Sequence, residues 1–274
     1  MEHPKQASFF SVGLVRGTVG FVVGLLVGII LISVIRLALG LPVTDPQLYG
    51  LPRASWVVGA LFGVFGFLLT QGVTSDWLKW ARGQETPEHP HDAFPSGLAR
   101  YLSATYDHKA IGIQYGVTSL IVFMLAGLFA LIFRTLLAFP GTYETFGMNL
   151  RDYNTVMTLH GIVMIAGILL GVAAMSNFLV PVMIGAKDMA FTRLNAFAFW
   201  MNVPAVIILL SSLFFGGLET GWTGYPPLST RGPLGMDMFF IGVYLVGFSS
   251  PSYFATSFQK QFGISPSQFI RKLR

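Results

Sequence analysis

The chain contains no cysteine, so disulfide bonds and thiolate metal sites are excluded. Charged side chains are also scarce: they make up 11% of the 274 residues, whereas hydrophobic residues make up 53% and the mean hydropathy is +0.66. This composition indicates an integral membrane protein rather than a soluble domain. The formal net charge of +5 is explained better by basic cytoplasmic loops than by nucleic-acid binding.

Long apolar runs predict an all-α, polytopic bundle of transmembrane helices. A further apolar run starts at Met238 but meets Ser249 after about a dozen residues, which is ~18 Å of helix against ~30 Å of hydrocarbon. The first apolar run has no small-residue cleavage site after it, so we expect it to remain as an anchor. We therefore predict a truncated sixth span after five full ones, at residues 17–35, 54–73, 110–133, 155–180 and 196–215.

Local signals mark the faces and ends of these spans. Gly20, Gly24 and Gly28 recur every four residues, which predicts either a face for close helix approach or an ordinary glycine-rich anchor. Asp107 is placed to cap the third span. Pro181 is expected to end the fourth.

Lysine and arginine are distributed unevenly between the two sides of the predicted bundle. Eight fall on the side of the N-terminus: Lys5, Arg16, Lys79, Arg82, Arg100, Lys109, Lys187 and Arg193. Five fall on the other: Arg36, Arg53, Arg134, Arg151 and Arg231. Because cytoplasmic loops carry the excess of positive charge, the N-terminus is predicted to be cytoplasmic.

Histidine is rare as well, and of the five in the chain only His160 lies inside a predicted span. An ionisable side chain in hydrocarbon is costly, and a neutral imidazole is a good axial ligand for haem iron. The alternative is a histidine that only hydrogen-bonds a neighbouring helix. Gly167 and Gly171 share its helical stripe, leaving either a flat slot for a porphyrin or a surface that packs another helix.

Four strings stand in a fixed order along the chain: DHKAIGIQY at 107–115, YNTVMTLHG at 153–161, NFLVPVMIGAKDMAFTRLNAFAFW at 177–200 and GWTGYPPLST at 221–230. Over about residues 100–247 the chain resembles subunit I of the haem-copper oxidases, the cytochrome c oxidase family. This resemblance implies electron transfer from cytochrome c through a low-spin haem to oxygen in aerobic respiration. It also implies proton pumping, other oxidase subunits as partners, and a lipid-embedded position in a prokaryotic plasma membrane.

The resemblance assigns roles to five residues. His160 would be an axial ligand of the low-spin haem, and Arg134 would bind a polar substituent of that haem. Asn177, Asp188 and Asn195 would form the mouth of a proton-uptake channel. Taken alone, Arg134 also fits a snorkelling helix-end arginine and Asp188 a solvated loop charge.

Other parts of the family's machinery are not expected from this chain. Oxygen reduction in the family needs a copper held by three histidines and a second haem with its own histidine, and the low-spin haem needs a second axial ligand. The remaining histidines are His3, His89, His91 and His108, all outside the predicted spans. We therefore expect no copper site and no oxygen reduction by this chain alone, and whether it acts as an enzyme stays open.

Residues 248–274 are polar and basic, and they resemble the last helix-turn-helix of AraC-type transcription regulators. We therefore divide the chain into an N-terminal extension (1–99), an oxidase-like core (100–247) and this tail, joined by a gene fusion that is more consistent with accident than with selection. The leading hypothesis is a fragment of oxidase subunit I. The alternatives are a membrane-anchored regulator that binds DNA through the tail, and a membrane protein without catalytic activity.

Overall fold

The computed structural model describes residues 12–85, 97–145, 147–189 and 191–248, and throughout these ranges its secondary structure is helical, with no strand. Within them, five helices are long and apolar enough to cross a membrane: α1 (Gly13–Ala38), α2 (Arg53–Gln71), α4 (His108–Ala138), α6 (Leu150–Met183) and α7 (Thr192–Ser211). Shorter helices are α3 (Ser75–Ala81), α5 (Thr142–Thr145) and α8 (Leu234–Phe248). The predicted all-α bundle is confirmed.

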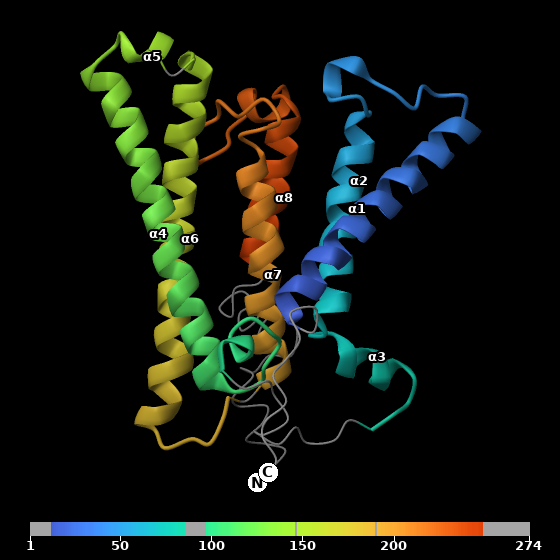
Figure 1. Cartoon of the computed structure of the whole chain (residues 1–274), viewed down its shortest axis with the longest axis vertical. Coiled ribbons are helices and arrows are strands. Elements are labelled where there is room, and N and C mark those ends of the chain that lie inside the picture. The colour runs from blue at the N-terminus through green and yellow to red at the C-terminus, as the bar shows by residue number, and fades with distance from the viewer. Residues whose placement is uncertain (1–11, 86–96, 146, 190, 249–274) are drawn as a thin grey trace.

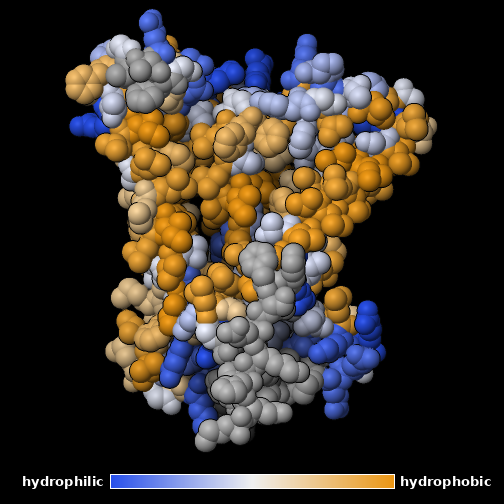
Figure 2. All heavy atoms as spheres, viewed as in Figure 1, coloured by the Kyte–Doolittle hydropathy of each residue, from blue (hydrophilic) through white to orange (hydrophobic). Residues whose placement is uncertain are grey.

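The five long helices and the shorter α8 form three neighbouring pairs, α1 with α2, α4 with α6, and α7 with α8 (Figure 1). The short helix α3 and the connection between α6 and α7 lie at one end of the molecule, and α5 lies at the other. On the face seen in Figure 2, apolar side chains cover the middle of the molecule and hydrophilic groups gather toward both ends. This arrangement is that of a multi-pass membrane protein.

The observed helix end agrees with the predicted one where a side chain caps the helix. It differs from the prediction where a proline was taken as the end signal. The carboxylate of Asp107 accepts a hydrogen bond of 2.9 Å from Lys109 N, so the predicted cap is confirmed. The prediction that Pro181 ends its helix was wrong, because α6 continues to Met183. Proline removes only one backbone donor, and near a helix C-terminus the chain continues when another group binds the freed carbonyl.

The fifth span lies four residues earlier than predicted, at Thr192–Ser211. Gly216 and Gly217 both adopt left-handed backbone angles, with φ of 85° and 70°, and the chain turns there instead of continuing as helix. The short apolar helix α8 likewise begins four residues before Met238, directly after Pro233.

Glycines bring α1 and α2 into direct backbone contact. A Cβ atom added at Gly24 would lie 2.2 Å from the carbonyl oxygen of Phe62, and one at Gly66 would lie 2.2 Å from the carbonyl oxygen of Gly20. A Cβ at Gly28 would lie 2.8 Å from Gly59 Cα. The glycine periodicity is therefore a face for close helix approach rather than an incidental composition of the anchor.

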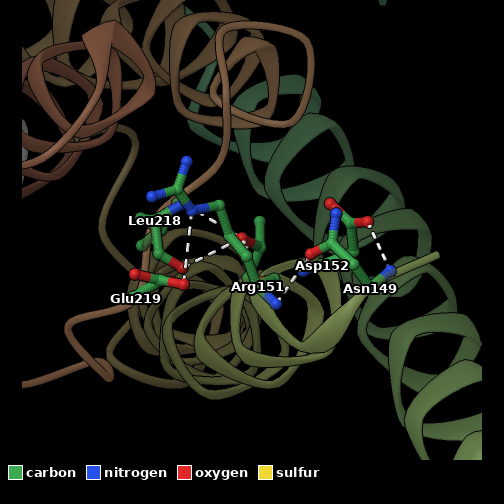
Figure 3. Close-up of polar contacts among 6 residues, drawn as sticks. Asn149, Arg151, Asp152, Leu218 and Glu219 are labelled. Atoms are coloured by element: carbon green, nitrogen blue, oxygen red, sulfur yellow. Dashed lines mark hydrogen bonds and ion pairs between the residues drawn. The ribbon is translucent and has the colours of Figure 1, made fainter.

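The start of α6 is fixed at the end of the bundle where α5 lies (Figures 1 and 3). Asn149 and Asp152 form a capping box in which each side chain accepts from the other residue's backbone N–H. Arg151 forms an ion pair of 3.2 Å with Glu219, and Thr155 Oγ1 donates to the carbonyl of Leu218. These contacts tie the first turns of α6 to the connection between α7 and α8 and so position the residues that follow.

Candidate functional site

His160 lies in the third turn of α6 and faces α4, half-buried. Its Nδ1 atom is 2.9 Å from the carbonyl oxygen of Ala126. Because a carbonyl can only accept a hydrogen bond, Nδ1 is the donor, and in the neutral form of imidazole the lone pair is then on Nε2. A backbone carbonyl on one ring nitrogen is the usual way in which proteins orient a histidine that binds a metal through the other.

The surroundings of His160 are apolar but not closed. The ring of Phe133, on α4, meets the imidazole edge-on with a centroid distance of 5.4 Å. Trp222 packs beside the next residue, since a Cβ added at Gly161 would lie 3.3 Å from its Cβ. The ring is thus held by α4 on one side and stays partly exposed, and its chemistry fits an axial ligand for haem.

Gly167 and Gly171 serve helix packing. A Cβ added at Gly167 would lie 3.2 Å from the ring of Phe123, and one at Gly171 would lie 3.2 Å from Ser119 Oγ. The same hydroxyl donates to the carbonyl of Gly167 at 2.8 Å. Of the two interpretations left open by the sequence, the structure favours the one in which these glycines admit α4.

Arg134 is exposed on α4, one residue after the phenylalanine that contacts His160. It lines a surface cavity of about 420 Å³ together with Thr135, Leu137, Ala138 and Phe139. The structure therefore places Arg134 and His160 toward the same end of the α4–α6 pair.

Asn177 and Asn195 are brought together although 18 residues separate them in the chain. Both are buried, and Asn195 Nδ2 donates to Asn177 Oδ1 at 2.5 Å. Asn177 Nδ2 in turn donates to the carbonyl of Ala173 at 2.8 Å. Asp188 is exposed in the connection between α6 and α7, where its Oδ1 accepts from Met189 N. It lies at the same end of the molecule as the asparagine pair.

His108 belongs to this cluster and was missed by the sequence reasoning. It is the first residue of α4, is 2% exposed, and its Nδ1 lies 2.9 Å from the backbone carbonyl oxygen of Asn177. Pro181, four residues after Asn177, has no N–H with which to bond that carbonyl. His108 supplies the donor instead. The signal was present in the sequence, because a proline inside a helix always frees the carbonyl four residues earlier.

Within the ranges that the structure describes, no three histidine, aspartate or glutamate side chains group closely enough to hold a metal ion. The expected lack of a copper site stays a prediction.

Comparison with known proteins gives a direct result. A family model described as Cytochrome C and Quinol oxidase polypeptide I matches residues 110–262, more than half of the chain. The chain belongs to this family. Its relatives include cytochrome c oxidase subunit 1 of Thermostichus vulcanus, which is 46% identical over 167 residues, or 60% of this chain and 29% of the relative.

Two further oxidase subunits are similar in sequence to this chain. Cytochrome c oxidase subunit 1 of Synechocystis sp. is 45% identical over 167 residues, which cover 60% of this chain and 29% of the relative. The heme-copper oxidase subunit I+III of Aeropyrum pernix is 36% identical over 162 residues, which cover 57% of this chain and 19% of the relative. The chain thus spans under a third of the length of the relatives it matches.

The predicted resemblance to the oxidase family is confirmed, and the division of the chain stays a prediction. The family match starts at residue 110, so α1, α2 and α3 precede it. The match ends at residue 262, past the boundary expected at 247, and the predicted helix-turn-helix tail at 248–274 lies outside the described residues.

Proposed function

We propose that this chain supplies the low-spin haem helix of a haem-copper oxidase, with His160 as an axial ligand. The observation that carries the proposal is the Nδ1 hydrogen bond from His160 to Ala126, which leaves the Nε2 lone pair for iron. The hydrogen bond fixes the orientation of the ring and increases the basicity of the ligating nitrogen. The phenyl ring of Phe133 packs against one side of the same imidazole.

Arg134 is proposed to hold a polar substituent at the edge of the haem. Its guanidinium is permanently charged, is exposed at the cavity near the end of α4, and forms strong hydrogen bonds with oxygen acceptors. A positive charge there favours the more negative, reduced state. When bound, the haem supplies one-electron transfer.

Asp188, Asn177 and Asn195 are proposed to form a proton-uptake entrance. An exposed carboxylate collects protons from water, and buried amides orient water molecules as donors and acceptors in turn. The observation in support is that Asn177 and Asn195 form a buried pair at the end of the molecule where Asp188 is exposed. With the N-terminus in the cytoplasm, as the lysine and arginine distribution favours, this entrance opens to the cytoplasm.

The complete activity that we propose for the assembly is electron transfer from cytochrome c to oxygen, coupled to proton pumping across a prokaryotic plasma membrane. This chain would contribute to it together with other oxidase polypeptides. Its five histidines include one suited to the low-spin haem, so a second axial ligand, copper and the oxygen-binding haem would be held elsewhere in the assembly.

The test is a reduced-minus-oxidised absorption spectrum of the purified full chain. We expect a haem band in the unchanged chain and in His91→Ala, which removes a histidine that lies outside the predicted spans. The band should be absent from His160→Gly and should return when imidazole is added, because free imidazole can replace the missing ligand. A band that survives His160→Gly without imidazole would reject the assignment.

A further inference from the structure

The structure contains a buried carboxylate that belongs to the part of the chain before the family match. Asp76, on α3, is fully buried. Its Oδ2 lies 2.7 Å from Nε of Arg193, and its Oδ1 lies 3.5 Å from Nζ of Lys79. A buried carboxylate is tolerated only with such charged partners. Arg193 lies on α7, 117 residues further along the chain, so this ion pair joins the N-terminal segment to the oxidase core.

Aromatic rings hold the arginine in place. Its Cζ atom lies 5.2 Å from the ring centre of Trp80 and 5.8 Å from that of Tyr106. A planar guanidinium stacked between rings and bound to a carboxylate has one orientation, which lysine would not reproduce. Burial raises the pKa of the Tyr106 hydroxyl and the negative charge of Asp76 raises it further, so that ring stays neutral.

The arginine is the second residue of α7, and Asn195 follows two residues later. Phe191, at the N-cap position, has no side-chain oxygen with which to cap the helix. Trp77 of α3 packs on Phe197, one turn further on, at a centroid distance of 4.8 Å. α3 therefore contacts the first two turns of α7 through an ion pair and a ring contact.

We propose that Asp76 is a positioning residue: through Arg193 it holds the first turn of α7 so that Asn195 meets Asn177. The role of that asparagine pair in proton uptake rests on the proposed function above, whereas the positioning itself does not. On this account the N-terminal helices are a working part of the oxidase core and not only an anchor.

A second ion pair provides a matched control. Arg53 of α2 lies 3.4 Å from Asp237 of α8 and also donates to the carbonyl of Gly232. This pair likewise joins the N-terminal helices to the core. It lies at the opposite end of the bundle, and its side chains are 45% and 30% exposed. Removing its charge should leave the first turn of α7 in place.

Because the chain has no cysteine, two introduced cysteines can be spin-labelled without background. We would place them at Ser176 of α6 and Thr192 of α7 in the otherwise full chain and measure the distance between the labels by pulsed electron paramagnetic resonance. We expect one narrow distribution in the parent, in Asp76→Glu, which keeps the charge, and in Asp237→Asn. In Asp76→Asn we expect a broader distribution that is shifted to longer distance.

An unchanged distribution in Asp76→Asn would overturn the proposal, and so would equal broadening in Asp237→Asn. If Asp76→Asn does not accumulate, Arg193→Lys gives the answer: broadening supports the proposal and an unchanged distribution rejects it. The haem spectrum is independent of this result. A missing haem band together with the expected distances would reject the proposed function and leave the positioning role of Asp76 standing.

Discussion

Replacing His108 with alanine should lower the free energy of unfolding far more than is usual for the first residue of a helix. The ring is 2% exposed, and its Nδ1–H is the donor to a carbonyl oxygen of Asn177 that Pro181 cannot serve. A buried acceptor left without a donor costs about 1–3 kcal/mol, and the cavity left by the ring adds to this. We expect His108→Ala to lower the free energy of unfolding by about 2–4 kcal/mol.

A second substitution separates the hydrogen bond from the cavity. With Pro181→Ala, the backbone N–H at position 181 can bond the Asn177 carbonyl as in an uninterrupted helix. In the double variant that carbonyl is no longer unpaired, whereas the cavity remains. The two substitutions should therefore be non-additive, with a favourable coupling energy of about 1–3 kcal/mol.

The assay is equilibrium unfolding of the four chains in mixed detergent micelles, followed by tryptophan fluorescence. Trp200 is 2% exposed and reports the packing of α7. A coupling energy indistinguishable from zero would show that His108 does not replace the donor lost at Pro181, and the account of this cluster would fail.

Four further substitutions, one of them a control, test other contacts by the same unfolding measurement. Gly24→Ala should strongly destabilise the α1–α2 pair, since its Cβ would lie 2.2 Å from the carbonyl oxygen of Phe62. The control Gly127→Ala, whose Cβ would have nothing within 4 Å, should stabilise the protein by up to about 1 kcal/mol. Equal effects of the two substitutions would refute the close α1–α2 contact. Asp107→Ala should cost about 1 kcal/mol or more, because it removes both a helix cap and the ion pair to Arg100, and a neutral result would contradict that capping role. Asp237→Asn should cost no more than about 1 kcal/mol, because its ion pair is partly exposed; a larger loss would mean that this pair is energetically central.

Much of the fold follows from the sequence because bilayer thickness dictates the length of each span. The errors came where local rules compete with tertiary contacts. Pro181 sits inside α6 because a histidine from another helix takes over its lost hydrogen bond. The start of α7 was placed four residues late because Arg193, a charged residue, was assigned to the loop, whereas Asp76 neutralises it within the helix.

The candidate site, too, could be predicted only in part from the sequence. His160 is conspicuous in the sequence because it is an isolated ionisable group in an apolar run. The structure shows that its ring faces α4, and its role as a haem ligand stays a prediction. The hydrogen bond to Ala126 could not be predicted, since any backbone carbonyl on a facing helix serves equally well. The burial of Asp76 also could not be predicted from the sequence. With Lys79 three residues later, Asp76 is typical of a solvent-exposed pair at a helix end.

The most direct test of the central claim is the identity of the nitrogen that binds iron. In the ferric full chain, with histidine labelled by ¹⁵N at the Nε2 position, hyperfine spectroscopy should show strong coupling between iron and this nitrogen, and the coupling should vanish in His160→Gly. Coupling to Nδ1, or coupling that persists without His160, would contradict the account.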